Sequence, residues 1–160
     1  MKKIAFIVLF LLTVLNLNAS ALDFKIFEMR NKLFETSQEI KKLMPQSNDS
    51  VLLISMFDSC ILTMTQIDAY YSMLGIFDRV RKEDLNNTTL DFMIGWLTET
   101  RKTNEINIKN LSSISSPIEK STKMYSDKLR SDFNDLNKIL DNELNKLSII
   151  KKSLKVKPKR

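Results

Sequence analysis

The residues that most often carry out catalysis are scarce in this 160-residue sequence. Histidine is absent, which removes the usual general base, the Ser-His and Cys-His pairs, and the histidine ligands of most zinc and di-iron sites. Two glycines are too few for a GxGxxG turn or a phosphate-binding P-loop. An enzyme that uses Asp, Lys, Tyr and Ser is the alternative, but these residues form no cluster along the chain. We therefore expect a protein that is not an enzyme and that uses no cofactor and no metal ion.

Asp58 and Asp68 are the candidates for paired catalytic carboxylates on the most apolar segment after residue 21. Ten helical residues correspond to about 15 Å, which is more than the spacing that glycosidases use. We expect both side chains to be solvated or ion-paired. Cys60 is the single cysteine, and it falls on the apolar side of the same segment. We favour a buried thiol that packs as a small hydrophobic group, with redox chemistry or an intermolecular disulfide as the alternative.

That segment, from Ser50 to Arg81, has the pattern of one long helix that is buried along most of its length. Steps of four and three residues place its main apolar residues on one stripe, namely Leu53, Phe57, Cys60, Met64, Ile67, Tyr71 and Leu74. A polar stripe follows the same rhythm and comprises Asp58, Thr65, Asp68, Ser72, Gly75 and Arg79. The polar stripe predicts a solvent-facing side, so we expect this helix not to span a membrane. Further apolar residues indicate packing against at least two neighbouring helices.

The rest of the chain predicts three more helices. Apolar residues on one face mark a first helix over residues 22–44, and Pro45 followed by polar residues ends it. A third helix begins near Leu90, after a short polar loop that makes it an antiparallel neighbour of the central helix. With 43% hydrophobic residues, three prolines and two glycines, the composition favours an all-α protein. We predict an all-α antiparallel bundle of about four long helices, of which the last is the longest.

The last helix is predicted from Pro117 to about Leu154, because Ser116 and Glu119 flank Pro117 in the arrangement of a capping box. It carries a heptad seam that Glu143 interrupts, formed by Tyr125, Leu129, Phe133, Leu136, Leu140, Leu147, Ile150 and Leu154. A coiled coil, with self-association through this helix, is the alternative. We favour the bundle because the other helices have apolar faces that need a partner. A length of about 55 Å, against about 35 Å for the first helix, predicts that the end of the last helix projects past the bundle.

Residues 1–21 have the three parts of a secretory signal peptide. Two lysines precede an apolar run from Ile4 to Leu15, and small residues that end at Ala21 form a cleavage site. The apolar run of about 12 residues is shorter than a membrane span, so an uncleaved anchor is the weaker alternative. We expect cleavage near Ala21 and export to the periplasm, the cell surface or the medium. Residues 22–154 are then a single helical-bundle domain.

The formal net charge of +6 comes from the two ends of the chain. Without two lysines in the signal and six bases in the last ten residues, 17 of the 25 bases remain against 19 acids. The bundle is therefore nearly neutral, and we expect no binding to nucleic acid. Residues 155–160 are predicted to form a basic flexible tail. The candidate residues for binding an anionic lipid or a cell-wall polymer are Lys151, Lys152, Lys155, Lys157, Lys159 and Arg160. A solubilising end without a partner is the alternative.

Phe27 and Phe34 lie one heptad apart, beside the main apolar face of the first helix. They are a candidate ridge for binding a protein partner, although packing against a second neighbouring helix is the explanation that we favour for them. We therefore expect an exported, non-enzymatic helical bundle that binds a protein or an anionic surface. The alternative function is a carrier that holds a small apolar ligand, such as a lipid, in the bundle core.

Overall fold

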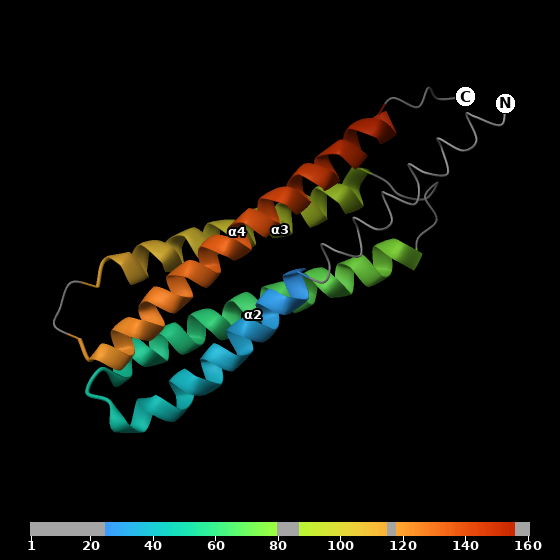
Figure 1. The fold of residues 1–160 in the computed structure, drawn as a ribbon. Helices are drawn as coiled ribbons and strands as arrows, with labels where there is room; N and C mark the ends of the chain where they lie inside the picture. The colour runs from blue at the N-terminus through green and yellow to red at the C-terminus, as the bar shows by residue number, and fades with distance from the viewer. Residues whose placement is uncertain (1–24, 80–86, 115–117, 156–160) are drawn as a thin grey trace, which may run out of the picture.

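The computed structural model describes residues 25–79, 87–114 and 118–155. Within these ranges the chain forms a first helix over residues 25–43, a short 3-10 turn η1 (Met44–Gln46), and the helices α2 (Ser50–Arg79), α3 (Asn87–Ser112) and α4 (Lys120–Lys155). Figure 1 shows them running alternately up and down, so that each is antiparallel to the next. The predicted all-α bundle of about four long helices is confirmed, and the last helix is the longest, with 36 residues.

The bundle consists of two antiparallel hairpins. The first helix lies beside α2 in Figure 1, and we call this pair the N-terminal hairpin. The helices α3 and α4 form the C-terminal hairpin and are the most extensively packed of the numbered helices. The two hairpins are linked directly where the Trp96 indole N–H on α3 donates to the Gln66 carbonyl oxygen on α2 over 3.0 Å.

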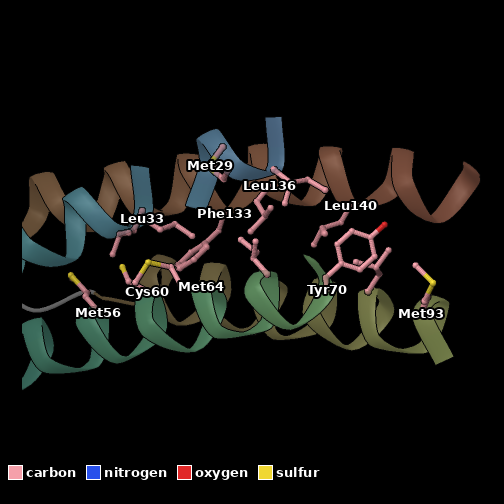
Figure 2. Packing of buried hydrophobic residues seen from close by; sticks show 14 of the residues in the cluster. Met29, Leu33, Met56, Cys60, Met64, Tyr70, Met93, Phe133, Leu136 and Leu140 are labelled. Carbon is pink, nitrogen blue, oxygen red and sulfur yellow. The ribbon is translucent and has the colours of Figure 1, made fainter. Parts of the chain in front are cut away.

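The core is one continuous cluster of apolar side chains that all four helices supply. The first helix contributes Ile26, Met29, Leu33 and Ile40, and α2 contributes Leu53, Met56, Cys60, Met64, Ile67 and Tyr70. The helix α3 adds Leu90, Met93 and Leu97, and α4 adds Leu129, Phe133, Leu136, Leu140 and Leu147. In Figure 2 the ring of Phe133 reaches from α4 towards Cys60 and Met64 of α2. The middle of the described bundle is therefore filled by side chains.

The buried face of α2 is turned slightly away from the predicted stripe. Four residues of that stripe are buried: Leu53, Cys60, Met64 and Ile67. Three others are only half-buried: Phe57, Tyr71 and Leu74. Three positions outside the stripe are buried instead: Met56, Thr63 and Tyr70. The difference arises because a polar residue, Thr63, lies near the middle of the buried face, where its hydroxyl donates to Asn104 of α3. The positions of the apolar residues alone therefore do not reveal the buried face.

The heptad seam of α4 follows the prediction in its middle and departs from it at its ends. Five seam residues are buried: Leu129, Phe133, Leu136, Leu140 and Leu147. Tyr125 is half-buried and Ile150 is 36% exposed, while the side chain of Leu154 lies outside the described part of the structure. Asn137 and Glu143 are buried together with the seam, so α4 brings polar groups into the bundle as well as apolar ones.

Glu119 joins the two hairpins at one end of the bundle. Its carboxylate accepts hydrogen bonds from the Ser47 hydroxyl (2.7 Å), the Asn48 backbone N–H (3.0 Å) and the Asn48 side-chain amide (3.1 Å). The backbone N–H of Glu119 donates in turn to Asp49 Oδ2 over 2.7 Å. We call these four residues the end clip. It connects the turn of the N-terminal hairpin to the start of α4.

The helix α4 begins later than predicted. It starts at Lys120 rather than Pro117, and the carbonyl oxygen of Glu119 accepts the Lys123 backbone N–H over 3.0 Å. The sequence motif assigned the Glu119 side chain to a local capping box, whereas the structure uses both carboxylate oxygens for residues more than 70 positions away. Ser116 and Pro117 lie outside the described residues. The Glu119 side chain therefore makes tertiary contacts that the local motif did not predict.

The end of α4 lies level with the start of α3. The ion pairs Arg101–Asp141 and Lys151–Asp91 both join residues whose numbers add to 242, which fixes an antiparallel register. In this register Lys155 lies opposite Asn87, the first residue of α3. The predicted projection of α4 was a comparison with the first helix, and α4 does extend beyond the described part of that helix in Figure 1. The start of α3 accompanies α4 as far as Lys151.

One helix among the described residues is long and apolar enough to cross a membrane, judged by length and composition: the Ser50–Gly75 part of α2. A core helix of a soluble bundle meets the same criteria. Here the helix buries one face against its neighbours and exposes Asp58, Thr65 and Ser72 on the other.

The turned face of α2 gives a prediction about stability. Met56→Ala should lower the free energy of unfolding by about 2 to 5 kcal/mol, because it removes a fully buried side chain. Phe57→Ala should lower it by less, since Phe57 keeps part of its contact with water. Asp58→Ala, at an exposed position, should change it by less than about 0.5 kcal/mol. Urea denaturation of the three variants measures this order, and a larger loss from Phe57→Ala would show that the wrong face has been assigned to the core.

The end clip gives a prediction about pH. The three hydrogen bonds from Ser47 and Asn48 hold the pKa of Glu119 below its ordinary value. A carboxyl whose pKa is lower in the folded state stabilises the fold above its unfolded-state pKa, and this stabilisation is lost as the pH falls through the folded-state pKa. The urea midpoint of the unmodified protein should therefore exceed that of Glu119→Gln at pH 7, and the gap should shrink below about pH 4. The exposed Glu99→Gln is the control, and a gap that does not depend on pH would contradict the assignment.

Candidate functional site

Six of the eleven large apolar side chains that are exposed among the described residues lie on the N-terminal hairpin. Phe27 and Phe34 of the first helix are 49% and 48% exposed. On α2, Ile54 and Ile61 are 48% and 38% exposed, and Val51 and Leu62 are exposed nearby. Exposed apolar residues that occur singly need no explanation, but a group of them on neighbouring helices is typical of an interaction site.

Two contacts fix how the helices of this hairpin face each other. The ring of Phe27 meets that of Tyr71 edge to face, with centroids 6.4 Å apart. The guanidinium of Arg30 forms two bonds to the Asp68 carboxylate, from Nε to Oδ1 (2.6 Å) and from Nη2 to Oδ2 (2.9 Å). Both pairs join residues whose numbers add to 98. The helices are therefore antiparallel, and Phe34 lies level with Met64.

The exposed phenylalanines and isoleucines lie on the same side of the N-terminal hairpin. Ile54 and Ile61 precede Asp68 by fourteen and seven residues, so all three share one side of α2. Phe27 and Phe34 lie within one turn of Arg30, on the side of the first helix that bonds to Asp68. We call the surface formed by Phe27, Phe34, Ile54 and Ile61 the outer face. The sequence indicated the two phenylalanines but not the two isoleucines.

The structure agrees with both roles expected for Phe27 and Phe34, packing against a neighbouring helix and exposure to a partner. Phe27 packs against Tyr71 and also keeps about half of its surface exposed, as Phe34 does. Packing against a second helix and presentation to a partner are therefore both compatible with these residues. The predicted ion pairing or solvation of the aspartates is confirmed, because Asp68 pairs with Arg30 and Asp58 is exposed. Nothing in their arrangement joins them as a catalytic pair.

The basic candidates at the end of the chain are only partly described. Lys151 belongs to α4 and pairs with Asp91 of α3, so it is part of the bundle rather than of a tail. Lys152 is exposed on the last turns of the same helix, and Lys155 is the last residue of α4. The remaining candidates lie outside the described residues: Lys157, Lys159 and Arg160.

Buried polar side chains link the hairpins, and the sequence analysis did not assign them to the core. Asn104 of α3 accepts from the Thr63 hydroxyl and donates its amide to Asn137 of α4, both over 3.2 Å. Further along the bundle the Tyr70 hydroxyl donates to Glu143 Oε1 over 2.6 Å. The sequence signal for this second contact was Glu143, which interrupted the predicted heptad seam.

These buried groups hold the helices to one another. Tyr70 and Glu143 are almost fully buried, and the second carboxylate oxygen of Glu143 lies 3.5 Å from the Lys146 ammonium group. Neither of the two hollows described in this structure is lined by Tyr70, Glu143 or the two core asparagines.

Cys60 is fully buried, as the sequence predicted. Burial, assisted by the charge of Asp132, raises the pKa of its thiol to about 12, so the reactive thiolate is not formed near neutral pH. Desolvation also raises the pKa of Asp132, although Lys128 and Lys32 oppose that shift. The thiol therefore behaves as a small core residue. In the described part of the chain, no group of three or more His, Cys, Asp or Glu residues is placed to hold a metal ion.

The two described hollows lie at the surface, where α3 meets α2 and α4. One of about 50 Å³ lies between α2 and α3 and is bordered by Ser59 and Asn107. The other, of about 290 Å³, lies between the end of α3 and the start of α4 and is bordered by Ile114, Lys123 and Arg130. The bundle centre, which the carrier hypothesis requires for its ligand, is occupied by core side chains (Figure 2).

Comparison with known proteins gives no relative from which a site could be transferred. No protein-family model, no curated protein and no solved structure matches this chain. The function must therefore be inferred from the residues of this chain and their arrangement.

The contact between Tyr70 and Glu143 gives a further prediction about stability. Tyr70→Phe keeps the ring but removes the hydrogen bond to a buried carboxylate, so it should lower the free energy of unfolding by about 1 to 3 kcal/mol. Tyr125→Phe, at a half-buried position on α4, should have a smaller effect. Urea denaturation at neutral pH measures both. Equal effects would mean that the buried hydrogen bond contributes nothing particular to the fold.

Proposed function

We propose that this protein is exported and acts without catalysis, as a helical bundle that binds a protein partner through its outer face. The observation that carries the proposal is the exposure of Phe27, Phe34, Ile54 and Ile61 on the outer face of the N-terminal hairpin. Aromatic and aliphatic side chains supply most of the affinity when a helix or a helical surface is recognised. The outer face presents such residues on both of its helices.

The spacing of the residues on the outer face fits an elongated apolar partner. Phe27 and Phe34 repeat every seven residues on one helix, and Ile54 and Ile61 repeat every seven residues on the other. Seven helical residues correspond to about 10.5 Å, which is also the repeat of an amphipathic helix that packs in a groove. The salt bridge between Arg30 and Asp68 neutralises the charges of these two side chains, which lie beside the outer face. The apolar residues can therefore be covered without an unpaired charge at this point.

Export is part of the proposal and is supported by the signal-like residues 1–21. The filled bundle centre supports surface binding over the alternative of a lipid carrier. The exposed Lys152 and the basic residues that follow α4 favour a second candidate, attachment to an anionic surface. This candidate places the binding site at the opposite end of the chain from the outer face.

A pull-down from cell-envelope fractions tests the proposal with three variants of the full chain. Phe27→Ser combined with Phe34→Ser should reduce capture of a protein partner at least about tenfold. Ile106→Ser, at a 58% exposed position on α3, is the matched control and should leave capture unchanged. A chain that ends at Lys155 tests the basic residues.

Loss of capture in the truncated chain alone, together with binding to anionic vesicles that disappears in high salt, would replace the outer face by the basic end. Equal capture by the double serine variant and the unmodified protein would also contradict the proposal. Urea midpoints of all variants show whether each remains folded, so that loss of binding is not confused with unfolding.

A further inference from the structure

We propose that the outer face receives a second copy of this chain, so that two bundles form a twofold dimer in which the first helix of each packs on α2 of the other. This inference rests on the proposed function of the outer face as a binding surface, and it names the partner. It places self-association on the N-terminal hairpin rather than on the last helix.

The two helices of the outer face present side chains of different size. One side presents Phe27 and Phe34 and the other presents Ile54 and Ile61, each pair at the same seven-residue repeat. A twofold axis parallel to the helices places the phenylalanine side of one copy over the isoleucine side of the other. Because Phe34 is level with Met64, its ring then lies within about 4.5 Å, measured along the helix, of Ile61 in the second copy. Large rings therefore meet smaller aliphatic side chains at the centre of the interface.

Two exposed lysines of the first helix and one exposed aspartate of α2 are complementary under the same axis. Lys41 and Lys42 are exposed at the end of the first helix, and Asp58 is exposed on α2. In the register of the hairpin, Lys42 lies within two residues of the level of Asp58. The axis keeps these levels, so the lysines of each copy face Asp58 of the other, and the two contacts occur symmetrically. Asp58 and the exposed Glu35 would instead oppose an anionic lipid surface, which favours a second copy over a membrane.

The size of the surface determines the strength of the association. The exposed side of α2 from Val51 to Ser72 is about 30 Å long, and two adjacent helices are about 20 Å wide. The face thus offers on the order of 600 Å² per copy, at the lower limit of specific interfaces. Each bundle also has a complete core of its own. We therefore expect a reversible dimer that forms at micromolar or higher concentration, and not an obligate one.

Sedimentation velocity of the exported product of the full chain, from micromolar to submillimolar concentration, tests this dimer. Phe34→Ser and Asp58→Lys should each weaken association at least about tenfold, whereas Ile106→Ser should not. A chain that carries Lys41→Asp and Lys42→Asp should also fail to associate with itself. Mixed with the Asp58→Lys chain, it should form a heterodimer, because the reversed charges face each other again.

A monomer at every concentration would overturn the dimer, as would a mixture that fails to restore association. Association that persists in Phe34→Ser but is lost in Ile149→Ser, at an exposed position on α4, would move the interface to the last helix. A monomeric protein that still captures another protein through Phe27 and Phe34 would contradict only the second copy as partner. The proposed function of the outer face would then stand.

Discussion

The burial of α2 among the other three helices is the constraint on which the rest of the structure depends. This helix is the most apolar of the numbered helices. As an isolated helix in water, without neighbours, it would not be stable. The first helix covers one flank of α2, and α3 covers the other. The Phe133 side chain of α4 packs against the middle of α2 (Figure 2). The partner helices α3 and α4 are more polar in composition than α2. The part of α2 that its neighbours leave uncovered contributes half of the outer face.

Polar groups inside the bundle restrict how the helices pair. Apolar seams with a seven-residue repeat can slide by a heptad and still find apolar partners. Such a slide of α2 would separate Thr63 from Asn104 and Tyr70 from Glu143, and it would leave buried donors and acceptors without bonds. The hydrogen bonds therefore select one register among several that hydrophobic packing would tolerate. The register of the first helix on α2 is fixed separately by the salt bridge between Arg30 and Asp68, and it places Ile61 within three residues of the level of Phe34.

The sequence was sufficient for the architecture because helix periodicity is local. Leu53, Ile67 and Phe133 were placed in the core from spacing alone. The remaining features depend on contacts between distant segments. Glu119 has the spacing of a capping residue, but its side chain binds a turn more than 70 positions away. In the candidate site the phenylalanines were indicated by their departure from the apolar stripe. Ile54 and Ile61 could be assigned only after the salt bridge from Arg30 showed which side of α2 faces the first helix.

The end clip also determines how the bundle can open. It fastens the two hairpins where the first helix turns into α2 and where α4 begins, and the contact between Tyr70 and Glu143 joins them far from that point. The contact between Tyr70 and Glu143 is buried, whereas the hydrogen bonds of the clip to Asn48 are exposed, so separation of the hairpins costs less at the clip. Amide hydrogens beside the clip would therefore exchange with solvent sooner than those around Tyr70.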